Sequence, residues 1–89
     1  MENIDDILSE RGERYGEYVN VALTAQMLKH ALRRSNGWND MAADMKESLE
    51  MISNKLARIV NGDCTYLDSW VDVAGYAKLV ADRLEKIGR

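Results

Sequence analysis

Apolar side chains recur every three or four positions through the second half of the chain, which is the spacing of one face of an α-helix. The first stripe consists of Met41, Met45, Leu49, Ile52, Leu56 and Ile59. The second stripe consists of Trp70, Val73, Ala74, Ala77, Val80, Ala81 and Leu84. Each stripe predicts a helix that buries this face in a core. Residues 19–32 are apolar more broadly, which predicts a helix in contact with more than one neighbour.

Start and stop signals divide the first part of the chain into two helices. A short helix is expected over residues 4–11, with Gly12 as its stop. A second helix is expected to begin around residues 15–17 and to run to about Arg34. The Asn36-Gly37 pair that follows is a typical end signal, because both residues tolerate the left-handed conformation that closes many helices.

Similar signals bound two longer helices in the second part. Asn39 or Asp40 can cap a third helix that continues to Val60, before another Asn-Gly pair at residues 61–62. After the loop of residues 63–65, Thr65 and Asp68 have the spacing of a capping box, in its aspartate variant. The fourth helix is expected to end near residues 87–88.

Composition agrees with this reading and narrows the fold. The chain has 89 residues, six glycines and no proline, which leaves few turn signals for a small β-sandwich. This length supports a single domain over residues 1–89, and so small a domain buries little surface by itself. We therefore predict an all-α fold, a four-helix antiparallel bundle with one short and three longer helices, completed by dimerisation.

Charge and cysteine content restrict the partners. Fifteen acidic and twelve basic residues give a net charge of −3, without the basic excess of a nucleic-acid-binding surface. Residues 1–6 are acidic and lack the apolar core of a signal peptide, and no segment is long and apolar enough for a membrane span. Cys64 is the single cysteine, so no internal disulfide can form. We expect a cytoplasmic protein with no nucleic-acid or membrane partner.

Four acidic residues lie away from the two apolar stripes. At about 100° per residue, Glu47 and Glu50 fall on the far side of the third helix, and Asp68 and Asp72 nearly opposite the Trp70 stripe. Such carboxylates on adjacent helices can converge, and oxygen ligands favour Mg²⁺, or Mn²⁺, over zinc. Lys55 and Arg58 follow Glu50 by one to two turns. The pattern predicts a metal site formed by the four acids, with these two cations binding phosphate.

Each of these residues also has a plain structural interpretation. Asp68 can serve as the capping partner of Thr65, and Lys55 and Arg58 can pair with neighbouring acids on their own helix. Asn20 can bind a nucleobase or ribose, or it can link two helices. Tyr76 can stack on a base or lie at a helix-helix contact. The sequence leaves these alternatives open.

The acidic spacing resembles that of the MazG-like, all-α nucleoside triphosphate pyrophosphohydrolases, whose signature is E-x-x-E on one helix and E-x-x-D on the next. Here the motifs read Glu47-x-x-Glu50 and Asp68-x-x-x-Asp72. The chain is more specifically similar to a small phage and prophage family related to that superfamily. The segments that carry this likeness are Arg11-Gly-Glu-Arg-Tyr-Gly-Glu-Tyr-Val-Asn20, Lys55-Leu-Ala-Arg-Ile-Val-Asn-Gly-Asp63 and Asp68-Ser-Trp-Val-Asp-Val-Ala-Gly-Tyr76.

The resemblance implies an activity and an assembly. Enzymes of the superfamily use Mg²⁺ to split a nucleoside triphosphate into monophosphate and pyrophosphate, as dimers or tetramers. Glu47, Glu50 and Asp72 match the motif and are the catalytic candidates. Ser69 stands where the second motif has glutamate, and Lys46 where a further glutamate often precedes the first.

Two functions therefore stay in view. The first is Mg²⁺-dependent hydrolysis of a nucleoside triphosphate, with Asn20 and Tyr76 as nucleotide-binding candidates, in the host cytoplasm if the chain is phage-encoded. The alternative is a catalytically inactive helical dimer that binds a nucleotide or a protein partner, in a phage regulatory or counter-defence role.

Overall fold

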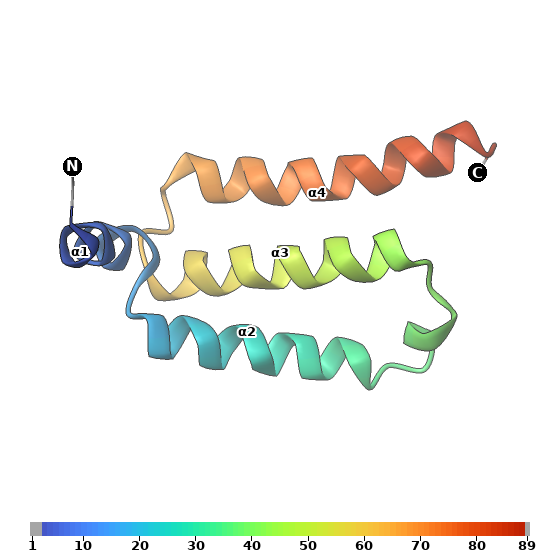
Figure 1. The fold of residues 1–89 in the computed structure, drawn as a ribbon. Helices are drawn as coiled ribbons and strands as arrows, with labels where there is room; N and C mark the ends of the chain where they lie inside the picture. Colours follow the sequence, from blue (N-terminus) through green and yellow to red (C-terminus); the bar gives the residue numbers. More distant parts are fainter. Residues whose placement is uncertain (1–2, 89) are drawn as a thin grey trace.

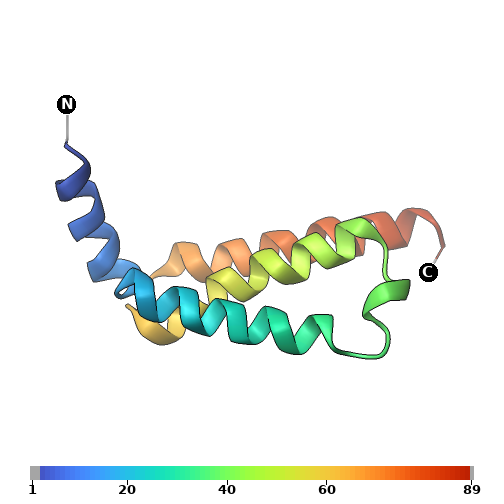
Figure 2. The ribbon, with the colours of Figure 1, turned by 60° about the horizontal axis from the view of Figure 1, so that its bottom comes forward.

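The computed structural model describes residues 3–88, and all regular secondary structure within that range is helical. The elements are α1 (Ile4–Tyr15), α2 (Tyr18–Arg33), a short 3-10 helix η1 (Trp38–Asp40), α3 (Ala43–Asn61) and α4 (Leu67–Lys86). Helices α2, α3 and α4 lie side by side with alternating direction, and α3 is in the middle (Figure 1). Helix α1 projects from one end of this layer (Figure 2). The predicted all-α class with one short and three longer helices is confirmed.

Helix α1 is longer than predicted, because Gly12 does not stop it. Asn3 caps its start by accepting a hydrogen bond from the Asp6 N–H at 2.9 Å. The helix passes through Gly12 and ends at Gly16. The φ of Gly16 is 90°, a value that glycine adopts readily and other residues rarely adopt. A Cβ at Gly16 would lie 2.1 Å from the Asn61 carbonyl oxygen. The stop is therefore where the end of α3 approaches, which local signals do not reveal.

The predicted caps of the two later helices are wrong. Asn39 and Asp40 belong to η1, and α3 begins three residues later with Ala42 as an N-cap that offers no side-chain bond. Helix α4 likewise begins after Tyr66 without a side-chain cap. Thr65 turns to the loop, where its N–H and hydroxyl both donate to Asp63 Oδ1, at 2.9 and 2.6 Å. These bonds lower the pKa of the Asp63 carboxyl below its ordinary 3.8.

Most side chains buried between the three side-by-side helices are small. The buried residues of the described chain are Ala25, Ser48, Ser53, Ala57, Ile59 and Ser69. The Ser53 hydroxyl donates to the Leu49 carbonyl at 2.8 Å, so its burial leaves no unpaired group. Small residues let the helix backbones approach closely, which explains how α3 packs against α2 on one side and α4 on the other.

The predicted core stripes are only partly buried within one chain: Ile59 is buried, but several other members are exposed. The Trp70 side chain is 52% exposed and Leu56 37% exposed, and Ala74, Ala77 and Ala81 are exposed as well. In a single layer of helices, both faces are open to solvent. An apolar stripe on one face is therefore fully buried only where a second layer covers that face. No helix within residues 3–88 is long and apolar enough to span a membrane.

A bidentate ion pair sets the register of α3 and α4 at one end. Arg83 donates from Nε to Asp44 Oδ2 at 2.5 Å and from Nη2 to Asp44 Oδ1 at 2.8 Å. These hydrogen bonds are the largest cause that lowers the pKa of the Asp44 carboxyl below its ordinary 3.8. The stability that this pair contributes is thus fully present above pH 3.8 and is lost as the pH falls through the lowered pKa.

An Asp44→Asn variant is accordingly expected to lose less stability on acidification than the unmodified protein. Urea unfolding midpoints, measured in steps between about pH 6 and pH 2, give the two profiles. The gap between them should be widest near neutral pH and should close at the acid end. Parallel profiles with a constant gap would show that Asp44 does not carry this proton linkage.

Candidate functional site

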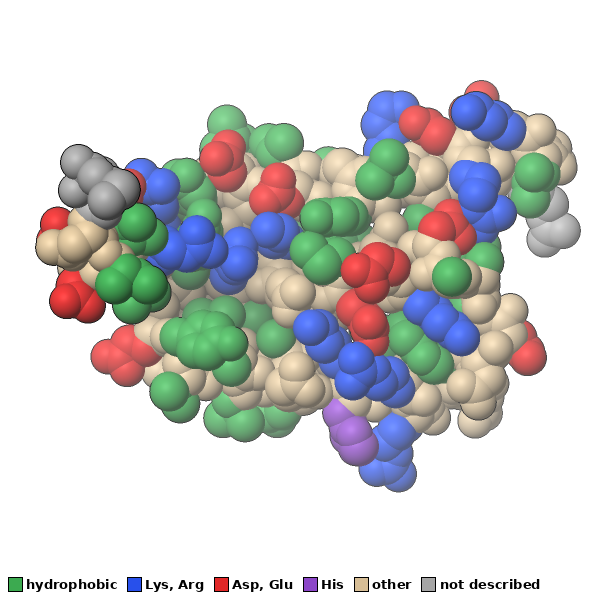
Figure 3. Space-filling view, viewed as in Figure 1, with side chains coloured by type: hydrophobic (Ala, Val, Ile, Leu, Met, Phe, Trp, Pro, Cys, Tyr) green, Lys and Arg blue, Asp and Glu red, His purple; other side chains and the backbone are tan. Residues whose placement is uncertain are grey.

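The two glutamates of the E-x-x-E motif lie one turn apart on α3, on its polar side. Glu47 is exposed, and Glu50 is half-buried beside α2. There Arg33 Nε donates to Glu50 Oε1 at 2.7 Å. The space-filling view shows acidic and basic side chains interleaved over this face of the helical layer (Figure 3). Glu50 thus forms a salt bridge with Arg33 of the neighbouring helix α2.

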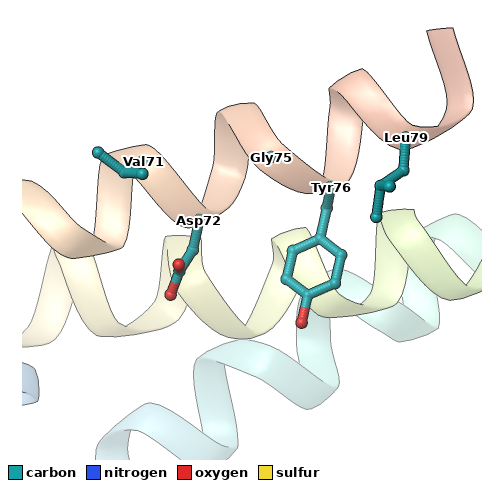
Figure 4. A pocket seen from close by; sticks show the side chains of 5 residues that line it. All are labelled: Val71, Asp72, Gly75, Tyr76 and Leu79. Carbon is teal, nitrogen blue, oxygen red and sulfur yellow. The ribbon is translucent and has the colours of Figure 1, made fainter. Parts of the chain in front are cut away.

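The two aspartates of the second motif lie on α4. Asp72 points toward α3 (Figure 4), where its Oδ2 is 3.1 Å from Lys55 Nζ. Asp68 is exposed and accepts a hydrogen bond of 3.3 Å from the Tyr66 hydroxyl. Of the alternatives left open by the sequence, Lys55 pairs with an acid, but with Asp72 of the next helix and not with Glu50.

The register of α3 and α4 separates the two acidic motifs. Because Lys55 lies level with Asp72, Glu50 is five residues, or about 7 Å, further along the α3 axis. Residues 3–88 contain no group of three or more His, Cys, Asp or Glu side chains that could hold a metal ion. One chain by itself therefore does not fit Mg²⁺ or Mn²⁺, and the four-acid site stays a prediction.

A groove of about 740 Å³ opens between α1, α2 and α3 on the same polar side. Tyr15 lies at its α1 end, with the Arg58 guanidinium carbon 4.6 Å and the Arg11 guanidinium carbon 5.3 Å from the ring centroid. Neither arginine takes part in the ion pairs of the described residues, so both retain their charge for an external anion. Cation–π contacts hold such groups in place without neutralising them.

Helix α2 and the middle of α3 form the remaining walls. Tyr18 and Lys29 line the groove from α2, and Asn54 lines it from α3. On α3, Glu47, Asn54 and Arg58 fall within about 40° of one another around the axis, so they form one stripe. The stripe runs from the acidic motif to the two arginines. The groove thus offers cations, aromatic rings and an amide to one ligand.

The sequence-predicted binding residues divide between this groove and other places. Arg58 lines the groove, whereas Asn20 is exposed and does not. Tyr76 lies with Asp72 in a shallow hollow of about 370 Å³ on α4, whose floor is opened by Gly75 (Figure 4). The structure therefore does not bring Asn20 and Tyr76 together in the groove, and their nucleotide roles stay predictions.

Sequence reasoning missed Arg11, Lys29 and Asn54 as groove residues. Arg11 lies in a segment that the family likeness singled out, but a helix stopped at Gly12 would not bring it to α3. Lys29 and Asn54 carry no motif, and only the packing of α2 against α3 places them at one groove. Their helical positions could have suggested a shared polar face, without showing which helix it faces.

Comparison with known proteins gives one family, whose function is unknown. The family described as "Domain of unknown function (DUF6378)" matches the chain over residues 1–84. No curated protein and no solved structure matches the chain. The match includes every groove residue and both acidic motifs, so the features described above lie inside the family's domain.

Proposed function

The chain belongs to the DUF6378 family, and for it we propose the binding of a nucleoside triphosphate in the groove between α1, α2 and α3. One observation carries this proposal: two arginines without an acidic partner among the described residues lie against a tyrosine at the end of a groove of about 740 Å³. That volume is within the usual range for small-molecule sites. A polyphosphate and an aromatic base are the ligand parts that such residues recognise.

Each part of the groove has a task in this proposal. Arg11 and Arg58 bind phosphate oxygens, because guanidinium groups form paired, charge-assisted hydrogen bonds to them. Lys29 adds a third positive charge on the α2 wall. Tyr18 is 82% exposed and offers a flat apolar surface to the base. The amide of Asn54, between the two ends, binds a hydroxyl or a ring nitrogen.

Hydrolysis of the triphosphate is the second candidate function, in line with the MazG-like resemblance. It is favoured by the position of the acidic motif on α3, where Glu50 lies about 12 Å along the axis from Arg58 and about 80° around it. A triphosphate held at Arg58 could therefore extend toward the acidic motif. Glu47, Glu50, Asp68 and Asp72 would be the ligands of Mg²⁺, which would offset phosphate charge. Because one chain does not gather them, we assign no reaction step to the metal.

The inactive alternative follows from the same residues. Glu50 and Asp72 are paired with Arg33 and Lys55, which provides the charge neutralisation that a metal ion would otherwise supply. A protein that binds the nucleotide without cleaving it, as a self-associating regulator or counter-defence factor of a phage, is consistent with this pairing.

Calorimetry and a product assay on the intact chain separate these outcomes. The eight common ribo- and deoxyribonucleoside triphosphates are titrated with and without Mg²⁺ or Mn²⁺, and pyrophosphate release is followed. Binding with no release supports the nucleotide-binding proposal. Release that is lost in Asp72→Asn but kept in Asp82→Asn, whose carboxylate only pairs with Lys78 on the same helix, supports hydrolysis. Failure of all eight nucleotides to bind would overturn both.

A further inference from the structure

Tyr66 lies outside the groove but contacts the residue that organises its cationic end. It directly precedes α4, and its ring centroid lies 5.9 Å from that of Tyr15, with 71° between the ring planes. This is the edge-to-face arrangement that aromatic pairs favour. Tyr66 does not itself line the groove, whereas Tyr15 does. An influence of Tyr66 on a bound ligand would therefore pass through Tyr15.

The Tyr15 ring in turn holds two cationic side chains. Tyr15 is the last residue of α1, and both Arg11 of the same helix and Arg58 of α3 lie over its ring. Two guanidinium groups beside one ring repel each other, and the negative face of the ring offsets part of this repulsion. The positions of both arginines thus depend on where the Tyr15 ring points.

Tyr66 is held from two sides. Its N–H donates to the Asp63 carbonyl at 3.1 Å, and the Asp63 N–H donates to the Arg14 carbonyl at 2.8 Å, which ties this loop to the end of α1. The Tyr66 hydroxyl donates to Asp68 Oδ2 at 3.3 Å, in the first turn of α4. The Tyr66 ring is therefore fixed by the loop and by α4, while the ring that it contacts belongs to α1.

Arg14 belongs to the same cluster but carries a compensated charge. Its guanidinium carbon lies 5.2 Å from the Tyr66 ring centroid, and it forms an ion pair with Glu10. Arg14 does not line the groove. Among residues 3–88, the uncompensated charge of the cluster therefore lies on Arg11 and Arg58, the two arginines that do line it.

We propose that Tyr66 is a positioning residue of the groove, an inference that rests on the proposed function. Tyr66 fixes the Tyr15 ring, and the ring holds the Arg11 and Arg58 guanidinium groups at a spacing that suits the phosphate oxygens of one ligand. Binding groups that are in place before the ligand arrives lose less side-chain entropy when it binds. The loop between α3 and α4 thus acts on a groove to which it contributes no lining residue.

Two substitutions of Tyr66 separate the ring from the hydroxyl. Tyr66→Leu removes the edge-to-face contact, so the affinity for inorganic tripolyphosphate and for the tightest-binding triphosphate of the eight should fall about 2- to 10-fold in calorimetry. Tyr66→Phe should keep the affinity of the unmodified protein, because it keeps the ring and the lost hydroxyl donates to Asp68, outside the groove. Unchanged affinity in Tyr66→Leu would overturn the positioning role.

Trp70→Leu is the control for a general loosening of the same loop. The Trp70 indole N–H donates to the Cys64 carbonyl at 2.8 Å, two residues before Tyr66, and Trp70 does not line the groove. Its replacement should loosen the loop but leave the affinity for both ligands unchanged. Equal losses in Trp70→Leu and Tyr66→Leu would mean that only the loop structure matters, which would overturn a specific role of the Tyr66 ring.

A measurement without ligand tests the positioning itself. An aromatic ring shifts the NMR signals of nearby protons, so the side-chain Nε–Hε signals of Arg11 and Arg58 report whether both groups lie at the Tyr15 ring. Both signals should move toward those of a free arginine in Tyr66→Leu and stay in place in Tyr66→Phe. Signals that do not move in Tyr66→Leu would show that Tyr15 keeps its position without Tyr66, against the proposal.

The two readouts also separate the role of Tyr66 from the proposed function. If no triphosphate binds to the intact protein, the proposed function is overturned, and the arginine signals still decide whether Tyr66 positions the two guanidinium groups. If a triphosphate binds equally well to the intact protein and to Tyr66→Leu, the proposed function stands and the positioning role is overturned.

Discussion

Gly62→Ala is expected to cause one of the largest losses of stability in this protein. A Cβ at residue 62 would lie 2.3 Å from the Tyr15 carbonyl carbon and 2.5 Å from the Arg14 carbonyl oxygen. Both are backbone atoms, so no side chain can turn aside to make room. The end of α1 must then move away from the end of α3, which breaks the bond from the Asp63 N–H to the Arg14 carbonyl, 2.8 Å long.

Gly16→Ala should act on the same junction from the other side. Its Cβ would meet the Asn61 carbonyl oxygen at 2.1 Å, and alanine would also have to adopt φ of 90°. Overpacking and the left-handed conformation together cost about 2–5 kcal/mol. A domain of this size is stabilised by about 5–13 kcal/mol in total, so either change removes a large part.

Gly75→Ala is the matched control for both substitutions. Residue 75 lies within α4, and a Cβ added there would meet no neighbouring atom within 4 Å, so alanine should fit. Because alanine favours the helix by about 1 kcal/mol, this variant should be equally or more stable. Urea unfolding followed by circular dichroism measures all three. Unchanged midpoints for Gly16→Ala and Gly62→Ala would show that α1 is not held at this junction.

Arg58→Ala is expected to weaken nucleotide binding about 10- to 100-fold. A hydrogen bond to a charged group contributes about 1.5–3 kcal/mol, and a factor of ten in affinity corresponds to about 1.4 kcal/mol. The affinity of Arg58→Lys should lie between those of the unmodified protein and Arg58→Ala, because lysine keeps the charge but loses the paired donors and the planar contact with Tyr15. Calorimetric titration with the tightest-binding triphosphate of the panel measures each affinity.

Arg34→Ala removes the same charge from a place outside the groove. Arg34 lies at the end of α2, where its Nη1 is 3.4 Å from His30 Nε2, and it does not line the groove. Its replacement should leave affinity within about twofold, apart from a small long-range effect that salt screens. Equal losses for Arg34→Ala and Arg58→Ala would mean that binding reflects net charge and not this site.

The helices were readable from the sequence because the apolar stripes repeat at the helical period over many residues. The positions at which the helices begin and end were harder to predict. Gly12 failed as a stop because its missing Cβ only weakens a helix, whereas Gly16 ends one where another backbone approaches. The Thr65–Asp68 capping box did not form because Asp63, two residues before Thr65, accepts the Thr65 backbone N–H that the Asp68 carboxylate would accept in such a box, and α4 begins only at Leu67.

The candidate site was only partly readable for a related reason. Spacing placed Glu47, Glu50, Asp68 and Asp72 on the sides away from the apolar stripes, and the structure has them on polar surfaces. Spacing along each helix does not state how far one helix slides against the next. The pairs Lys55–Asp72 and Asp44–Arg83 set that register, and they hold the two acidic motifs apart within a chain.

By itself, the sequence determined that this chain is helical, which positions share a face on each helix, and that its acids and its apolar stripes lie on different faces. These properties depend on the local geometry of an α-helix, in which each residue lies next to those three and four positions away. Tertiary structure alone decided that Arg58 of α3 joins Arg11 at the Tyr15 ring, and that parts of the apolar stripes remain uncovered. Both depend on contacts between residues far apart in the chain, whose distance and direction no local pattern contains.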